Sequence, residues 1–536
     1  MKVALCQLDP TVADFDGNAA KILDAYRASV AEGADLVVSA ELALCGYPPL
    51  DLLHRPDFIA RAERALAALA AQVGAVPLVV GSVRRDDSAF PALRNAAFLV
   101  ADGEIRDHHD KRLLPTYDVF DEARYFAPGD RATVWSVAGQ RVGVAICEEL
   151  WDPDGALYPV DPVAELRGAV DLVLSPSASP FHAGKQSFRR ALFTRQAERL
   201  GAPLLVVNQV GAHDELVFDG GSLAVVGGGV HTELPPFTES RAVVDLSAPA
   251  GEPVPPIAHE DEIARAVVAG IEGYFRKSGL REAWIGLSGG IDSAVVAALA
   301  VDALGAENVH GVAMPSRYSS EGSLTDAAAL SAALGIDHRV VPIESAHVGL
   351  HAAIESGVGE APHGLADENL QARLRGLILM TLSNQYGGAV LATGNKSEMA
   401  VGYCTLYGDM CGALAPLGDV TKVDVYAIAR SAAYVDRIPA STIEKEPSAE
   451  LRPDQRDTDS LPPYETLDPI LVGYLEEKRG AEELIAAGHD RAVVEGALGR
   501  VLFHEYKRRQ AAPIIRVSPR AFGIGRRVPL ARRREV

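Results

Sequence analysis

The stretch Gly286-Leu287-Ser288-Gly289-Gly290-Ile291-Asp292-Ser293 lies between two apolar segments and decides the fold around it. Residues 282–285 before it have the pattern of a buried strand, and residues 294–301 after it have that of a helix. A strand, a glycine turn and a helix start form an anion-binding geometry, because glycines allow close approach and free N–H groups point at the anion. Asp292 would repel a phosphate unless a divalent cation bridged its carboxylate and the phosphate oxygens.

A simple Gly-Gly turn with a serine or aspartate N-cap would give a similar local pattern without any ligand. The string from Ser288 to Ser293 is more specific than that, and the chain contains no Gly-x-x-x-x-Gly-Lys-Ser/Thr loop. It resembles the pyrophosphate loop of the ATP pyrophosphatases, which split ATP between its α and β phosphates to adenylate a substrate. The resemblance implies that ATP phosphates are bound by Leu287, Ser288, Gly289, Gly290, Ile291, Asp292, Ser293 and Ala294.

Length and composition restrict the class of protein. The chain has 536 residues, of which 48% are hydrophobic, so we expect two to four domains with large cores. With 51 basic and 72 acidic residues the net charge is −21, which argues against nucleic acid as a partner. Five cysteines without paired spacing predict no disulfide framework and a reducing cytoplasm. No apolar stretch is long enough to span a bilayer, and the first apolar run is too short for a signal peptide, so we expect no membrane partner.

The first half of the chain alternates short apolar runs with helical patterns, which predicts a layered α/β fold. We expect helices at residues 18–31, 59–73 and 186–200. We expect strands at residues 3–5, 36–38, 77–81, 96–100, 142–146, 172–174 and 204–207.

Glu41, Lys111 and Cys147 stand at the ends of such runs, where ligands meet side chains in α/β folds. Singly, each has an ordinary structural explanation: a helix cap, a solvated lysine and a small buried hydrophobe. Together, in this order and within the strings 41–52 and 147–151, they resemble the glutamine-hydrolysing branch of the nitrilase superfamily. The resemblance implies an α-β-β-α sandwich.

The chemistry of glutamine hydrolysis requires these three residue types. The Cys147 thiolate would attack the γ-carboxamide carbon, and a thiol that is protonated at neutral pH needs a base, for which Glu41 fits. Lys111 and the backbone N–H of Glu148 would stabilise the tetrahedral oxyanion. The products are a thioester and ammonia, and water activated by Glu41 then releases glutamate.

The nitrilase resemblance also implies a set of residues around the glutamine. Glu122 matches a supporting acidic position, and the Glu148 site would lie beside the substrate. A cation at Lys185 would meet the substrate α-carboxylate. Ser177 competes with Ser179 for a hydrogen bond to glutamine. The residues that the resemblance assigns to glutamine binding are Tyr117, Ser179, Lys185, Glu122 and Glu148.

Residues 246–258 contain four prolines and show no periodicity, which is typical of a stiff, exposed connection. We therefore expect one domain over residues 1–245, a linker over 246–258 and a second domain over 259–536. In the second domain, strand patterns at 309–315 and 338–343 flank a helix ending near Leu334, so the βα units predict a doubly wound parallel sheet. A mobile loop is expected at residues 356–366, and a polar, proline-bounded lid at residues 447–455.

The strings at residues 368–376, 393–398, 419–422 and 504–509 closely resemble the NAD synthetases. That resemblance implies a Rossmann-like sheet of the adenine nucleotide alpha hydrolase type. It also implies amidation of deamido-NAD⁺ through an acyl-adenylate, with ammonia passed from the first domain. By motif, Asp292 and Glu398 would hold Mg²⁺, and Thr393 and Lys422 would contact ATP. The deamido-NAD⁺ site would contain Asn369, Arg373, Glu398 and Lys507.

Other functions compete with this interpretation. The chain could be another glutamine-fed adenylating amidotransferase that acts, for example, on a purine nucleotide or a tRNA base. The first half could instead be an inactive binding or scaffolding module. The presence of all three residues Glu41, Lys111 and Cys147 argues against this. The resemblance implies a homo-oligomer, a dimer or larger. The basic run at residues 525–534 is expected to be solvated or to contact an acidic surface of a second subunit.

Overall fold

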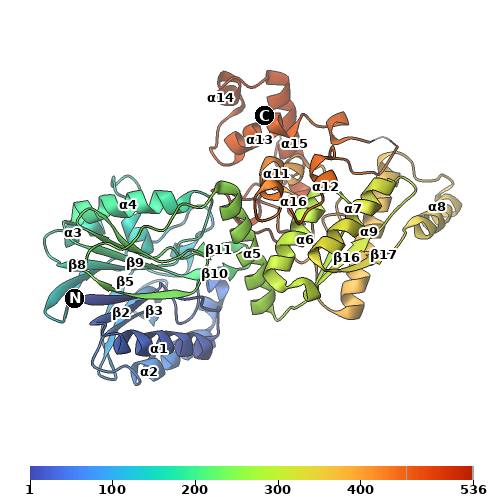
Figure 1. Ribbon diagram of the computed structural model, residues 1–536. Coiled ribbons are helices and arrows are strands. Elements are labelled where there is room, and N and C mark those ends of the chain that lie inside the picture. Colours follow the sequence, from blue (N-terminus) through green and yellow to red (C-terminus); the bar gives the residue numbers. More distant parts are fainter. Residues whose placement is uncertain (454, 534–536) are drawn as a thin grey trace. The chain divides into compact units, whose positions relative to one another are not determined.

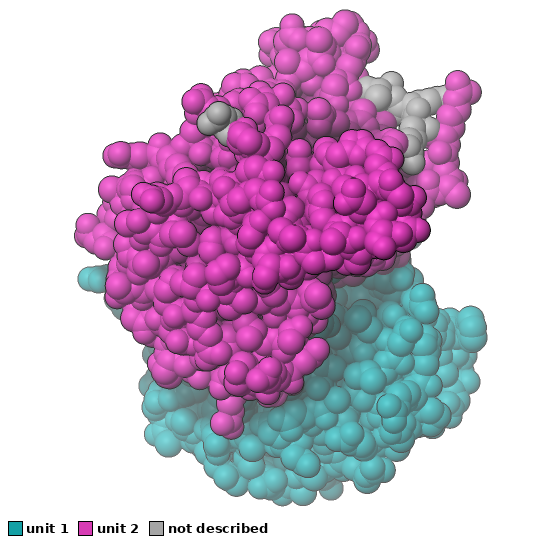
Figure 2. Space-filling model, turned by 90° about the vertical axis from the view of Figure 1, so that its right-hand side faces the viewer, with its two compact units in different colours: residues 1–256 teal, residues 257–536 magenta. Residues whose placement is uncertain are grey.

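The computed structural model describes residues 1–453 and 455–533, which form two compact units over residues 1–256 and 257–536 (Figure 2). Asp454 of the expected lid and Arg534 of the basic run lie outside the described residues. In the part of the chain that is described, no helix is both long and apolar enough to cross a membrane.

Unit 1 contains two six-stranded sheets (Figure 1). The first has the order β14 (Ser240–Asp245), β1 (Lys2–Gln7), β2 (Leu36–Ser39), β3 (Leu78–Arg85), β4 (Leu93–Ala101) and β5 (Glu104–Asp110). The second has the order β13 (Gly229–Glu233), β12 (Leu223–Val226), β9 (Leu204–Asn208), β8 (Leu172–Ser177), β7 (Gln140–Val144) and β6 (Thr133–Val137). Each sheet has three parallel central strands, β1-β2-β3 and β7-β8-β9, and a short hairpin of β10 (Val210–His213) and β11 (Leu216–Asp219) stands apart.

The side chains of β1 show how the layers of unit 1 are held together. Val3 and Leu5 pack between the two sheets, whereas Ala4 and Cys6 face α1 (Phe15–Ala31) and α2 (Pro56–Ala70), since successive residues of a strand point to opposite faces. The second sheet is covered in the same way by α3 (Pro162–Leu166) and α4 (Lys185–Leu200). The expected α-β-β-α sandwich is therefore confirmed.

Unit 2 is built on a parallel sheet in which β15, the strand before the glycine loop, is central. The order is β17 (Asp337–Val340), β16 (Val309–Ala313), β15 (Ala283–Gly286) and β18 (Ala389–Leu391). Trp284 packs with Leu379 of α9 (Leu365–Tyr386) on one face. The alternating residues Ala283 and Ile285 point to the opposite face, where α6 (Ile291–Leu304) contacts the sheet. This arrangement confirms the doubly wound α/β sheet.

Shorter helices complete unit 2 and form a second core around Leu467, Leu498 and Val501. The helix before β15 is α5 (His259–Ser278), and α7 (Glu321–Leu334) lies between β16 and β17 in sequence. The remaining helices are α8 (Glu344–Val358), α10 (Lys396–Val401), α11 (Lys422–Arg430), α12 (Ala440–Glu444), α13 (Tyr464–Leu475), α14 (Ala481–Ala486), α15 (Arg491–Phe503) and α16 (Glu505–Arg508).

Several element boundaries differ from the sequence-based expectations, and three of them have a clear physical reason. The expected loop at 356–366 is shorter, because α8 continues to Val358 and is closed by Gly359 at φ 90° before α9 begins at Leu365. The expected helix at 59–73 begins three residues earlier, since Pro56 occupies its first position, where no N–H is needed. The expected strand at 338–343 ends at Val340, two residues before Pro342, which has no N–H to donate.

Candidate active sites

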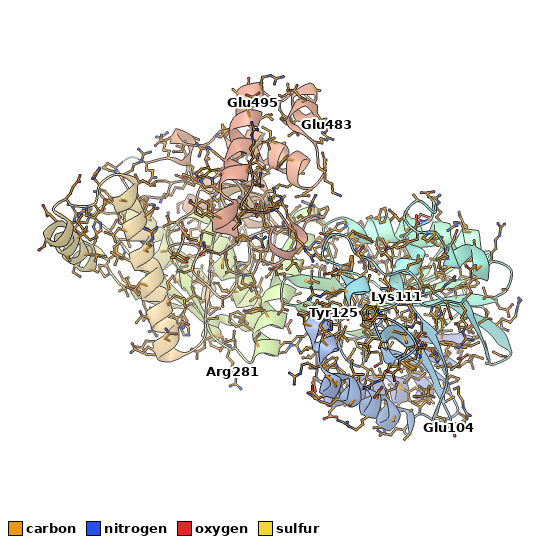
Figure 3. All side chains as sticks on the ribbon, turned by 180° about the vertical axis from the view of Figure 1, so that it is seen from behind. Glu104, Lys111, Tyr125, Arg281, Glu483 and Glu495 are labelled. Carbon is orange, nitrogen blue, oxygen red and sulfur yellow. The ribbon has the colours of Figure 1, made fainter. Side chains whose placement is uncertain are left out.

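A buried lysine in unit 1 joins two carboxylates. The Nζ atom of Lys111, directly after β5, lies 2.6 Å from Oε1 of Glu41 and 2.8 Å from Oε1 of Glu122. Asn95 donates to Glu41 at 2.7 Å, and Tyr47 donates to Glu122 at 2.8 Å. Figure 3 shows Lys111 in the interior of the unit and Glu104, at the other end of β5, on its outside. Hydrogen bonds from Lys111, Asn95 and Tyr47 thus hold the two carboxylates, although Oε2 of Glu122 is buried without a partner among the described residues.

Cys147 is the first residue of the short 3-10 helix η3 (Cys147–Leu150) that follows β7, and its φ is 42°. Such a backbone conformation is unusual for a residue with a side chain and is typical of functional sites. The carboxylate of Glu149 fixes this turn, because it accepts the N–H of Ile146 at 2.5 Å and lies 3.0 Å from Nε2 of His109. His109 and Glu149, which the sequence analysis did not select, thus hold Cys147 in place.

The electrostatics of this site favour a neutral thiol. Burial and the charge of Glu41 raise the pKa of Cys147 well above its ordinary value, although Lys111 and the N–H of Ala178 act in the opposite direction. Burial alone would lower the pKa of Lys111, but the charges of Glu122 and Glu41 raise it, so Lys111 remains an ammonium. A protonated cysteine needs a base to remove its proton before the sulfur can attack.

Two tyrosines converge on the carboxylate of Glu148, next to Cys147. The Tyr117 hydroxyl donates to it at 2.9 Å and the Tyr158 hydroxyl at 2.8 Å. Burial is the largest cause of the raised pKa of Glu148, although the charge of Lys111 and both tyrosine hydroxyls act against it. Tyr158 is a further residue that the sequence did not identify, because its segment contains no recognisable motif.

The segment after β8 is held against the carboxylate of Glu41. The N–H of Ala178 donates to Oε2 of Glu41 at 3.0 Å, which brings Ser177 and Ser179, both buried, next to the carboxylate. Lys185, at the start of α4, donates to the carbonyl of Pro180 at 2.5 Å and lies over the ring of Trp151, 4.9 Å from its centroid. The predicted glutamine contacts therefore surround the region of Cys147.

In unit 2 the glycine loop joins β15 to α6 as the sequence predicted. Gly289 has a φ of 76°, and a Cβ atom at this position would lie 2.4 Å from the carbonyl oxygen of Ser323 in α7. Only glycine fits this close approach. Gly290 occupies the N-cap position of α6, and its N–H donates to the Ser288 hydroxyl at 3.2 Å. The loop thus presents a helix N-terminus to the adjacent pocket.

Two carboxylates from distant parts of the chain converge on one ammonium beside this loop. Lys422, at the start of α11, contacts Asp292 and lies 3.3 Å from Oε1 of Glu398 in α10. Burial and the charge of Asp292 raise the pKa of Glu398, against the effect of Lys422. Convergent carboxylate oxygens of this kind fit a hard divalent cation such as Mg²⁺.

The loop, Thr393, Glu398 and Lys422 line a single pocket. Its other lining residues include charged groups that the sequence did not single out, among them Arg375, Lys445 and Asp457, and one from the expected lid, Glu450. Glu450 belongs to the expected lid, and its carboxylate accepts hydrogen bonds from the hydroxyls of Ser320 at 2.9 Å and Ser323 at 2.7 Å.

The other residues assigned to deamido-NAD⁺ do not line this pocket. Each of them instead forms a hydrogen bond with the segment at residues 402–406. Asn369 accepts a hydrogen bond from the Thr405 hydroxyl at 2.7 Å, and Arg373 donates to the carbonyl of Leu406 at 3.2 Å. Lys507 donates to the carbonyl of Cys404 at 2.6 Å. Tyr403 and Cys404 of this segment line the pocket, so the three residues support a part of the pocket wall.

Comparisons with known proteins cover both units. A model of the carbon-nitrogen hydrolase family matches residues 2–250, and a model of the NAD synthase family matches residues 263–511. A glutamine-dependent NAD(+) synthetase of Synechocystis sp. is 44% identical over 550 residues, with 99% of this chain and 98% of that protein covered. The chain belongs to the glutamine-dependent NAD⁺ synthetases.

Other members of the glutamine-dependent NAD⁺ synthetase family agree over the same length. The Thermotoga maritima protein is 41% identical, with 99% of each chain covered. The solved structure of the Acinetobacter baumannii enzyme, in complex with adenosine diphosphate, is 37% identical and has a TM-score of 0.78, covering 99% of this chain and 98% of that one. The full-length similarity supports NAD⁺ synthesis over another glutamine-fed adenylating amidotransferase.

Proposed function

We propose that this chain amidates deamido-NAD⁺ to NAD⁺, with glutamine as nitrogen donor and ATP as the activating nucleotide. AMP, pyrophosphate and glutamate would be released. The observation that carries the proposal is that one chain holds a neutral cysteine beside a carboxylate–lysine pair in unit 1 and a glycine loop with paired carboxylates in unit 2.

In unit 1, Glu41 acts as the general base and takes the proton of Cys147 as the sulfur attacks the glutamine carboxamide. Lys111 stabilises the negative charge that develops on the carboxamide oxygen, together with the N–H of Glu148. Ammonia leaves with a proton returned by Glu41, and the same carboxylate then activates water against the thioester. Tyr117, Ser179, Lys185, Glu122 and Glu148 hold the substrate, and Tyr158 positions Glu148.

In unit 2, the loop 287–294 binds the ATP phosphates so that the α-phosphate faces the nicotinate carboxylate. Asp292 and Glu398 would hold Mg²⁺, which would neutralise phosphate charge. Lys422 moves from the carboxylates to the phosphates, and Thr393 contacts the nucleotide. Asn369, Arg373, Glu398 and Lys507 shape the deamido-NAD⁺ site. Pyrophosphate leaves as the adenylate forms, and ammonia then displaces AMP.

This proposal assigns glutamine hydrolysis to residues 1–245, the connection to residues 246–258 and synthesis to residues 259–536. It places the reaction in the cytoplasm, supported by five free cysteines. We also propose that two or more chains associate into a homo-oligomer. Support comes from apolar side chains exposed on α8 and α9, among them Val348, Val358, Leu365 and Leu377. Sedimentation of the purified chain would test this, and a monomer at micromolar concentration would contradict it.

The experiment that tests the function combines ATP, Mg²⁺, deamido-NAD⁺ and glutamine with the full-length chain. We expect NAD⁺, AMP, pyrophosphate and glutamate in equal amounts. ADP in place of AMP would contradict the adenylate, and a purine nucleotide used in preference to deamido-NAD⁺ would favour the alternative acceptor.

A further inference from the structure

Helix α8 is attached to unit 2 by an unusually small buried surface. It spans Glu344–Val358, all of which the structure describes, and His347 is its one buried residue. Apolar side chains such as Val348 and Val358 are exposed, the latter by 77%. Within one chain, burial of apolar surface contributes little to holding this helix in place, so its polar contacts carry more of the attachment.

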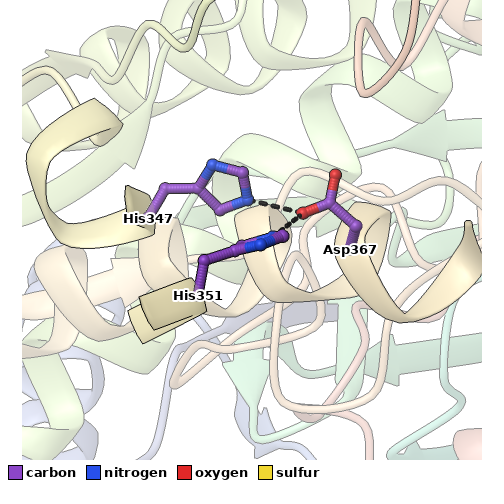
Figure 4. Close-up of side chains that lie close together, drawn as sticks. All are labelled: His347, His351 and Asp367. Carbon is purple, nitrogen blue, oxygen red and sulfur yellow. Dashed lines mark hydrogen bonds and ion pairs between the residues drawn. The ribbon is translucent and has the colours of Figure 1, made fainter. Parts of the chain in front are cut away.

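His347 belongs to a cluster of three side chains that face one another (Figure 4). His347 and His351 lie one turn apart on the same side of α8, and Asp367 lies in the first turn of α9. The Nε2 atom of each histidine lies 2.6 Å from the same oxygen, Oδ1 of Asp367. The two imidazole rings are 4.7 Å apart at an angle of 72°.

The chemistry of the three atoms suits a metal ion. Neutral imidazole nitrogens and a carboxylate oxygen are ligands of Zn²⁺, and three protein ligands with a water molecule make a tetrahedral site. Ligand atoms around a zinc ion lie about 3.3 Å apart, so small rotations of the three side chains would open the space for one. His351 and Asp367 are partly exposed, so water can reach the fourth position.

We propose that His347, His351 and Asp367 bind one Zn²⁺ or similar transition-metal ion, which fixes α8 to the start of α9. This site differs in chemistry from that of Asp292 and Glu398, whose oxygen ligands suit Mg²⁺, whereas imidazole nitrogens select later transition metals. The ion joins the two helices on either side of the connection at residues 359–364. It thereby holds the N-terminal turn of α9, the helix that carries Asn369 and Arg373.

The test uses the full-length chain after removal of metals with a chelator. Co²⁺ is added as a spectroscopic probe, and Zn²⁺ affinity is measured in competition with a chromophoric chelator. The variants are His351→Ala and Asp367→Asn. His363→Ala is the matched control, because His363 lies in the same connection, is 82% exposed and stands outside the cluster. Circular dichroism verifies that each variant is folded.

We expect one Co²⁺ per chain with the visible absorption of a tetrahedral site in the wild type and in His363→Ala. Loss of a ligand in His351→Ala or Asp367→Asn should weaken zinc binding by at least about 100-fold. Zn²⁺ should also slow hydrogen exchange in α8 of the wild type but not of these two variants. Equal binding by the wild type and His351→Ala, or no saturable binding by the wild type, would leave a hydrogen-bonded cluster only and overturn the proposal.

Discussion

The ammonium of Lys422 contacts the carboxylate of Asp292, although 130 positions separate them in the sequence. The same ammonium lies 3.3 Å from Glu398, so one positive charge is shared between two carboxylates. This shared contact holds the two carboxylates together at the edge of the pocket, where they would serve as ligands of a divalent cation.

This relationship predicts the effect of Asp292→Ala. Without its carboxylate the pocket loses a metal ligand, and we expect synthesis of NAD⁺ to fall by about 10²–10³-fold with either glutamine or ammonium. Glutamine hydrolysis should persist, since the residues of unit 1 are unchanged. Glu307→Ala, an exposed carboxylate of the same unit, serves as the control. Synthesis at the wild-type rate in Asp292→Ala would exclude the metal role.

Replacement of the nucleophile separates the two reactions. Cys147→Ala should abolish synthesis from glutamine and leave synthesis from ammonium salts close to the wild-type rate, because added ammonia bypasses the thioester. An electrophilic glutamine analogue should add its mass to Cys147 in the wild type, as shown by peptide mass spectrometry. Failure of this labelling would favour an inactive first unit, and loss of both activities would refute the division of labour.

The variant Glu41→Gln is expected to make the thiol more acidic and the enzyme slower. The negative charge of Glu41 raises the pKa of Cys147, so its removal should shift the alkylation of Cys147 by iodoacetamide toward lower pH. Loss of the base should nevertheless lower glutamine hydrolysis by about 10²–10⁴-fold. Both are measured on the same preparation over a pH series. A slower alkylation together with unchanged hydrolysis would show that Glu41 is not the base.

Two adjacent glycines give a matched test of the loop. Gly289→Ala should destabilise unit 2 by about 1–3 kcal/mol, because a Cβ atom is both strained at this φ and too close to Ser323. Gly290→Ala should cost much less, since its backbone is extended and the nearest atom is the mobile Ser288 hydroxyl at 3.2 Å. Hydrogen exchange in α6 during urea unfolding measures the difference. Equal destabilisation would disprove the close-approach argument.

The sequence predicted the layers and the sheet of unit 2 because buried strands and amphipathic helices have local patterns. It did not predict β10 to β14: β14 pairs with β1 from the opposite end of the unit's sequence, and β10–β11 and β12–β13 are hairpins of strands only four or five residues long. The same reason applies to the site residues. Glu41, Lys111 and Cys147 stand in recognisable strings, whereas Tyr158 stands in a segment without a motif. The lid was predicted, but the contact of Glu450 with Ser320, 130 residues away, was not.

At Cys147 the left-handed backbone places thermal stability and catalytic activity in conflict. Glycine adopts a φ near 42° without steric cost, and asparagine does so more easily than most other residues. Replacement of Cys147 by glycine or asparagine relieves this backbone strain and can therefore make the chain more heat-resistant than its natural form. A screen for thermal tolerance alone would therefore favour variants that have lost the nucleophile.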